Sequence, residues 1–181
     1  MIQPENAALV LIDIQGKLAQ LMFERDRLFT RLRQLIDVAN LFDMPILWME
    51  QLPDKLGPTV PDIAEKLDGL SPMAKSTFSC FRDAGFKRAL AQSRRRHLIL
   101  AGIESHICVY QSCRDALSAG FEVSIVQDAI SSRTEANYRL GLERMVMAGA
   151  APVSVEMLAF DMQQVAEGPR FRQMIQLFRD A

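Results

Sequence analysis

The chain has 181 residues, is 49% hydrophobic and carries a formal net charge of -1. This length and hydrophobic content suffice for one full core, so we predict a single domain over residues 1–181. The near-neutral charge, without basic runs interleaved with aromatic residues, argues against nucleic acid as a partner.

Cysteine usage and the N-terminal segment bear on the cellular compartment. The cysteines, Cys80, Cys108 and Cys113, are odd in number and lack CxxC spacing, which argues against a disulfide framework and a structural zinc site. The N-terminus has no basic segment, and its apolar run is interrupted at Asp13, too early for a signal peptide or a membrane span. We therefore predict a cytoplasmic protein in a reducing compartment, with no membrane partner.

The N-terminal quarter of the chain is typical of a βαβ unit. The apolar run at 7–12 predicts a strand that is covered on both faces of a parallel sheet. It ends at Asp13, at the sheet edge where α/β proteins bind ligands, although a capping role explains this aspartate equally well. Helical apolar spacing predicts a helix over 28–42, and a second strand follows over 46–49. The proline-rich segment 50–61 predicts part of a lid over a site.

The next segment adds a charged group to the same sheet edge. Residues 73–75 predict a short edge strand, and Lys75 at its end can point to the rim that carries Asp13. An isolated lysine is usually solvated, so Lys75 is a candidate site residue only in combination with Asp13 and the other candidate residues. A helix over 83–93 is predicted to follow.

The most informative stretch lies in the middle of the chain. An apolar strand over 97–101 is broken by Gly102, and Ser105 is the predicted N-cap of a helix that runs to residue 118. This places Cys108 in the first helical turn, where free backbone N–H groups and the helix dipole favour a thiolate. The position suits a nucleophile, and a small buried structural cysteine is the alternative.

The C-terminal part continues the alternation of strands and helices. Asp128 follows one of these strands as a second strand-end carboxylate, and Thr134 is the predicted N-cap of the next helix. The predicted elements are strands over 122–126 and 152–155, helices over 134–147 and 156–165, and a tail helix that starts at residue 168. The tail helix has an amphipathic stripe, which we expect to dock on its own sheet or on a second subunit, formed by Phe171, Met174, Ile175 and Phe178. This alternation predicts a doubly wound α/β fold.

Four segments, taken in order, resemble the isochorismatase-like cysteine hydrolases. They are Leu-Ile-Asp-Ile-Gln at 11–15, Lys75 with Phe-Ser-Cys-Phe at 78–81, Gly-Ile-Glu-Ser-His-Ile-Cys-Val at 102–109, and Asp-Ala-Ile-Ser-Ser-Arg at 128–133. The resemblance extends over nearly the whole chain. It implies a three-layer, doubly wound fold with a six-stranded parallel sheet of order 3-2-1-4-5-6, in which Asp13 and Cys108 flank the switch point.

By position, the resemblance implies a catalytic triad of Asp13, Lys75 and Cys108. Cys108, with a pKa lowered by the helix N-terminus and by Lys75, would attack a carbonyl carbon. Asp13 would pass the thiol proton to the leaving amine and then activate water to hydrolyse the thioester. The resemblance also implies a cis peptide bond before Glu104, so that the backbone N–H groups of Glu104 and Cys108 would form an oxyanion hole.

Departures from the wider family narrow the predicted chemistry. The segment 48–53 lacks the Asp-x-His metal motif of nicotinamidases, and the chain has only His97 and His106, so we expect no metal and no other cofactor. True isochorismatases hydrolyse a vinyl ether and lack the nucleophilic cysteine that is present here. The candidate substrate-binding residues are Gln15, Trp48, Gln51 and Phe78. The two aromatic residues among them, Trp48 and Phe78, would fit a hydrophobic core equally well.

The sequence therefore predicts a metal-independent cysteine hydrolase that cleaves a C–N bond of a small molecule, in an amide, a carbamoyl compound or an imide. One alternative is an isochorismate-type vinyl ether hydrolase, and another is a catalytically idle binding or scaffold member of the family. The resemblance also implies a homo-oligomer, either a dimer or a tetramer. The stripe that contains Phe171 and Phe178 is a candidate subunit interface.

Overall fold

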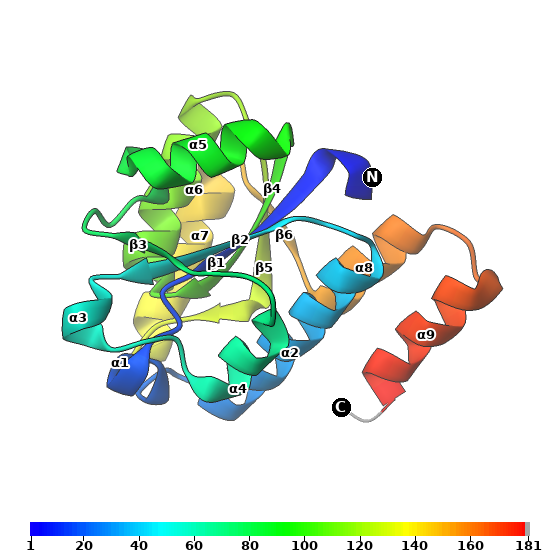
Figure 1. The fold of residues 1–181 in the computed structure, drawn as a ribbon, viewed down its shortest axis with the longest axis horizontal. Helices are drawn as coiled ribbons and strands as arrows, with labels where there is room; N and C mark the ends of the chain where they lie inside the picture. Colours follow the sequence, from blue (N-terminus) through cyan, green and yellow to red (C-terminus); the bar gives the residue numbers. More distant parts are fainter. Residues whose placement is uncertain (180–181) are drawn as a thin grey trace.

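Figure 1 shows the computed structural model of the chain, which describes residues 1–179. One six-stranded parallel sheet forms its centre, in the order β3-β2-β1-β4-β5-β6, which confirms the predicted order. The strands are β1 (Ala7–Ile12), β2 (Ile46–Gln51), β3 (Met73–Lys75), β4 (His97–Ile103), β5 (Glu122–Ser131) and β6 (Ala151–Val153).

Helices cover both faces of the sheet (Figure 1). The α-helices are α1 (Gly16–Gln20), α2 (Arg25–Leu41), α3 (Pro53–Leu56), α4 (Pro61–Ala64), α5 (Ala84–Ser93), α6 (Tyr110–Ser118), α7 (Glu135–Met147), α8 (Val155–Gln163) and α9 (Gly168–Arg179). Helices α2, α8 and α9 pack over one face, and α5, α6 and α7 pack over the other. Within residues 1–179, every helix is too short or too polar to cross a lipid bilayer.

Strand β1 lies at the centre of both cores. Leu9 and Leu11 belong to the core under α2 and α8, whereas Val10 and Ile12 belong to the core under α5 and α6. Because successive side chains of a strand point to opposite faces, a strand buried on both sides must be apolar throughout. This explains the uninterrupted apolar run of β1.

The structure corrects two predictions about strand ends. Strand β4 continues through Gly102, which has a φ of 114° and approaches β1 so closely that a Cβ there would lie 2.1 Å from the Ile12 carbonyl oxygen. Strand β5 continues to Ser131, so Asp128 lies within the strand and not at its end. The Asp128 carboxylate accepts a hydrogen bond from the Val155 N–H (3.0 Å) and therefore has a structural role at the start of α8.

The amphipathic stripe of α9 docks within its own chain. Met174 is fully buried, and Phe171 and Phe178 pack against the core formed with α2 and α8. The side-chain amide of Gln34 on α2 donates a hydrogen bond to the Leu177 carbonyl oxygen at 2.7 Å. Docking on its own sheet was one predicted outcome, but the stripe covers helices instead. The prediction that the stripe forms a subunit interface stays a prediction, since Phe171 and Phe178 are only partly buried by their own chain.

Replacing Gly102 by alanine tests the contact between β4 and β1. Gly149 has a similar φ of 109°, but no described atom lies within 4 Å of a Cβ built there. Both substitutions carry the strain of a positive φ, about 1–3 kcal/mol, and only Gly102→Ala adds a steric overlap. We expect Gly102→Ala to lower the free energy of unfolding by at least about 2 kcal/mol more than Gly149→Ala, as measured by urea denaturation. Equal losses would contradict the close approach.

Candidate active site

Three of the predicted site residues meet at one edge of the sheet. Asp13 follows β1, Lys75 ends β3, and Cys108 lies in the helical turn after β4. The Lys75 Nζ donates a hydrogen bond to Asp13 Oδ2 at 2.6 Å, and Asp13 and Cys108 line one cavity of about 100 Å³. The same cavity is lined by Leu18, Gln51, Leu56, Phe78, Ile103, Glu104 and Ile107.

The Lys75 ammonium is held from several sides. Besides Asp13, it donates to Gln51 Oε1 at 2.6 Å and lies 3.2 and 3.3 Å from the carbonyl oxygens of Thr77 and Phe78. Its side chain is fully buried. An ammonium group has three protons, so these four acceptors occupy it completely. Lys75 is therefore fixed in the site and has no free donor for a further ligand.

Gln15 is a structural neighbour of the site. Its Oε1 accepts a hydrogen bond from the Gln51 N–H at 2.6 Å, and its Nε2 donates to the carbonyl oxygens of Gln51 (3.1 Å) and Gly57 (2.7 Å). These bonds join the end of β2 to the loop after α3. Gln15 is fully buried and is not among the described residues that line the cavity.

Trp48 also lies outside the cavity. It belongs to the core under α2, and its indole N–H donates to Thr59 Oγ1 at 2.8 Å. The buried carboxylate of Glu50 accepts from the Thr59 N–H and hydroxyl at 2.6 and 2.7 Å. Together, these bonds fix the proline-rich segment, which contains α3 and the start of α4 where a lid loop was expected. Of the four candidate substrate-binding residues, only Gln51 and Phe78 line the cavity.

The turn that carries Cys108 differs from the expected helix start. Residues Ser105–Val109 form a π-helical turn, and the predicted Ser105 N-cap is wrong because Glu104 occupies the cap position. The Ser105 hydroxyl is instead hydrogen-bonded to the Ser132 hydroxyl at 2.6 Å. Gly141 of α7 lies directly against this turn, since a Cβ there would be 2.6 Å from the Ser105 carbonyl carbon. The role of Gly141 was not predicted, although a glycine inside a helix often marks such a contact.

Glu104 lines the cavity next to this turn. The peptide bond between Ile103 and Glu104 is cis. The Glu104 N–H donates no hydrogen bond to the part of the chain that the structure describes. Its buried carboxylate accepts hydrogen bonds from the Arg133 backbone N–H (3.2 Å) and Nε (3.1 Å). The backbone N–H of Glu104 is thus available next to Cys108, while its side chain is already paired.

Electrostatics at the site follow from burial. Burial raises the pKa of Asp13 above its ordinary value, although the Lys75 ammonium opposes this shift. Burial, followed by the Asp13 carboxylate, raises the pKa of Cys108, opposite to the direction expected from the sequence. With its pKa raised, the resting thiol keeps its proton and lies within hydrogen-bonding reach of the Asp13 carboxylate, whose Oδ1 atom accepts no N–H or O–H hydrogen bond from the described residues. This arrangement suits a thiol whose proton is taken by Asp13 during the reaction.

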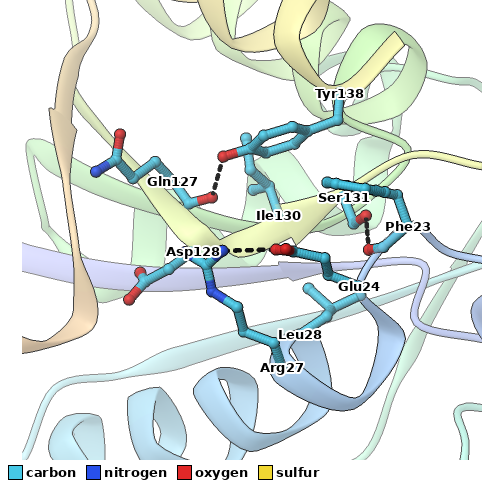
Figure 2. A pocket seen from close by; sticks show the side chains of 9 residues that line it. All are labelled: Phe23, Glu24, Arg27, Leu28, Gln127, Asp128, Ile130, Ser131 and Tyr138. Atoms are coloured by element: carbon cyan, nitrogen blue, oxygen red, sulfur yellow. Dashed lines mark hydrogen bonds and ion pairs between the residues drawn. The ribbon is translucent and has the colours of Figure 1, made fainter. Parts of the chain in front are cut away.

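A second cavity lies at the carboxyl-terminal part of β5, between β5, the start of α2 and α7 (Figure 2). It measures about 10 Å³, which leaves room for about one water molecule. The Tyr138 hydroxyl donates to the Gln127 carbonyl oxygen at 2.9 Å, and the Ser131 hydroxyl donates to the Phe23 carbonyl oxygen at 2.7 Å. The first bond joins α7 to β5, and the second joins β5 to the segment before α2, so both have a structural role. Among residues 1–179, no three His, Cys, Asp or Glu side chains are grouped as metal ligands would be.

The amino-acid sequence of the chain is similar to those of proteins that contain an isochorismatase domain. A family model described as "Isochorismatase domain" matches residues 7–157. Isochorismatase domain-containing protein 2A of Mus musculus is 32% identical over 179 residues, which cover 99% of this chain and 85% of that protein.

Two solved structures have the same fold. A structure described as MAR1 ribonuclease from Caenorhabditis elegans is 32% identical, with a TM-score of 0.90 and coverage of 98% of this chain and 91% of that one. The YcaC gene product of Escherichia coli, described as an octameric hydrolase of unknown specificity, is 22% identical, with a TM-score of 0.92 and coverage of 99% and 91%.

Replacing Asp13 by asparagine tests the coupling between the carboxylate and the thiol. Because the carboxylate raises the pKa of Cys108, Asp13→Asn should lower that pKa and speed the alkylation of Cys108 by iodoacetamide several-fold at about pH 8. Mass spectrometry would follow the modified peptides, with Cys80 and Cys113 as internal controls because burial raises the pKa of each to about 12. Asp62→Asn is the matched exposed control. An unchanged or slower rate at Cys108 would contradict the coupling.

Proposed function

The chain belongs to the isochorismatase family, and on that basis we propose that it is a metal-independent cysteine hydrolase that cleaves a C–N bond in a small amide, carbamoyl compound or imide. The observation that carries this proposal is the placement of Cys108 in one cavity with the Asp13 carboxylate, which is paired with Lys75 at 2.6 Å. A thiol, a base and a buried cation are the groups that such a hydrolysis needs.

In the first proposed step, the Cys108 sulfur forms a bond to the substrate carbonyl carbon. Asp13 accepts the thiol proton and passes it to the substrate nitrogen as the C–N bond breaks. For a primary amide, ammonia leaves and a thioester remains on Cys108. The raised pKa of Asp13 supports this role, since it makes the carboxylate a stronger base than an exposed aspartate. Lys75 stabilises the ionised form of Asp13 and the negative charge that develops in the site.

In the second proposed step, water hydrolyses the thioester. Asp13 takes a proton from the attacking water, and the Cys108 sulfur leaves and is reprotonated. The products are a carboxylic acid, the free thiol and the amine that left earlier. The negative oxygen that forms in both steps needs hydrogen-bond donors, for which we propose the backbone N–H groups of Glu104 and Cys108. The N–H of Glu104, which donates to no atom of residues 1–179, supports this assignment.

The family name and the solved relatives suggest other reactions. A vinyl ether hydrolase would need an acid but no thiol, so the presence of Cys108 beside Asp13 favours the amide reaction. The Caenorhabditis elegans protein is described as a ribonuclease. For this chain, no lysine or arginine is among the described residues that line the cavity, which gives a phosphodiester no cationic contact there.

Assembly and location are also proposed by analogy. The Escherichia coli relative is described as an octamer, which supports a homo-oligomer for this chain but not the expected dimer or tetramer in particular. Cys80, Cys108 and Cys113 are free thiols in the structure, as expected in a reducing compartment. We therefore propose a cytoplasmic homo-oligomer.

Substitution of Cys108 tests the covalent route. We expect Cys108→Ala to lower the hydrolysis rate of a substrate amide by at least about 10³-fold, because no nucleophile remains. Rapid acid quenching of the wild-type reaction, followed by mass spectrometry, should detect an acyl group on the Cys108 peptide. Cys113→Ala, which changes a buried thiol outside the cavity, is the matched control. If Cys108→Ala retains its activity, and in particular if it hydrolyses a vinyl ether, the thioester proposal is wrong.

The pH dependence of the reaction tests the role of Asp13. Asp13 must be ionised to accept the thiol proton, so kcat/KM should fall as the pH decreases through its pKa. Because burial raises this pKa above the ordinary 3.8, the decline should begin at a higher pH than for an exposed aspartate. The measurement is kcat/KM against pH over the range in which circular dichroism shows the native fold. A rate that stays constant down to the ordinary aspartate pKa would exclude Asp13 as the base.

A further inference from the structure

The walls of the active-site cavity are mostly apolar. Five of its nine lining residues have hydrocarbon side chains, namely Leu18, Leu56, Phe78, Ile103 and Ile107. Phe78 is 55% exposed, so it stands at the open side of the cavity. Such walls stabilise a hydrocarbon group of a ligand and give no hydrogen bond to a charged one.

The charges near the cavity disfavour an anionic ligand. Its two charged lining residues, Asp13 and Glu104, are both acidic and both buried. The Glu104 carboxylate is already paired with Arg133, and the Lys75 ammonium is occupied by Asp13 and three other oxygen atoms. A carboxylate in the cavity would therefore lose its water without gaining a cationic partner, which is costly.

One oxygen atom of a cavity-lining residue accepts no N–H or O–H hydrogen bond from the described residues. This oxygen is the Oδ1 atom of Asp13, which is 3% exposed. An ionised carboxylate oxygen only accepts hydrogen bonds. In the resting site the Cys108 thiol is the donor next to this carboxylate, and the substrate nitrogen can take over that contact once the thiol has given up its proton. In the proposed reaction, the substrate nitrogen must lie within reach of Asp13 to receive its proton. A primary amide places an N–H donor at that point.

The remaining polar contacts and the size of the cavity limit the rest of the ligand. The side-chain amide of Gln51 accepts a hydrogen bond from Lys75 and donates one to the Ser76 carbonyl oxygen at 3.1 Å. Few of its hydrogen-bonding positions are therefore left for a ligand. The Glu104 N–H, which has no acceptor in the part of the chain that the structure describes, can donate to a carbonyl oxygen. The cavity volume of about 100 Å³ is smaller than the roughly 150 Å³ of a cavity that holds a benzene molecule, which leaves space for a short acyl group only.

From these observations we infer that the substrate is a small, uncharged primary carboxamide with a short apolar acyl group, and that the site selects against amides that carry a carboxylate. This inference rests on the proposed function and specifies its substrate. The amide nitrogen contacts Asp13, the carbonyl oxygen contacts the Glu104 N–H, and the acyl group contacts the apolar wall formed by Leu18, Leu56 and Ile107.

Three amides of similar length test the selection against charge. Butyramide is apolar, succinamide is polar but uncharged, and succinamate has the shape of succinamide with a terminal carboxylate. We expect kcat/KM to decrease in that order, with succinamide at least about 10²-fold above succinamate because the buried carboxylate has no cationic partner. The same compounds would be tested for protection of Cys108 against iodoacetamide at about pH 8.5, which measures binding without turnover.

A pair of variants locates the selection in the cavity. Leu56 is 36% exposed and lines the cavity, whereas Leu70 is 45% exposed and is not among its lining residues. Leu56→Arg supplies a cation at the opening, so the ratio of succinamide to succinamate in protection and in kcat/KM should fall at least about 10-fold. Leu70→Arg should leave the ratio unchanged.

Each outcome has a distinct meaning. Equal or better protection by succinamate than by succinamide overturns the selection against charge and leaves the cysteine hydrolase proposal intact. Protection by the uncharged amides without release of ammonia supports the inferred ligand class but contradicts the proposed function. Absence of protection by all three amides overturns the inference. A ratio that changes equally in Leu56→Arg and Leu70→Arg also overturns it, because the selection would not arise in the cavity.

Discussion

The buried ion pair between Lys75 and Asp13 is the interaction on which the site depends. Removing two charges from water costs several kcal/mol for each ion, and their attraction offsets this cost only when the geometry is good and the other polar atoms are satisfied. Lys75 meets this condition through Gln51 and two backbone carbonyl oxygens in addition to Asp13. Because β2 lies between β3 and β1, the lysine reaches past the end of β2 to its partner. The register of three strands, the Gln51 side chain and the loop after β3 must therefore all be correct before Asp13 can serve as the base that we propose.

The two halves of the sheet contribute different parts of the chemistry. The half that contains β1, β2 and β3 supplies the ion pair of Lys75 and Asp13, and the half that contains β4 and β5 supplies the thiol and the Glu104 N–H, which has no partner among the described residues. Two glycines allow these parts to approach each other. Gly102 admits the backbone of β1 beside β4, and Gly141 admits α7 against the turn that carries Cys108. The catalytic proposal therefore rests on backbone contacts as much as on the reactive side chains.

Much of this arrangement follows from local sequence signals. The apolar run of β1, the short strand that ends at Lys75 and the Thr134 cap, which accepts from the Asn137 N–H at 3.2 Å, were all predicted. The errors concern interactions between distant segments. Ser105 was a reasonable cap by its residue type, but its hydroxyl is hydrogen-bonded to the hydroxyl of Ser132, which is 27 residues away in the chain. The raised pKa of Cys108 reflects burial and the nearby Asp13, which depend on the assembled fold and cannot be inferred from a helix position alone.

The central place of β1 in the sheet has a consequence for synthesis of the protein. One edge of β1 pairs with β4, with Ala7 aligned to His97, so that edge has no partner until β4 leaves the ribosome. At about 5–20 residues per second, the apolar β1 strand waits for several seconds with an unpaired edge. Unpaired apolar strands associate readily with other chains. The order of the strands along the chain therefore exposes this edge of β1 to association with other chains during that interval.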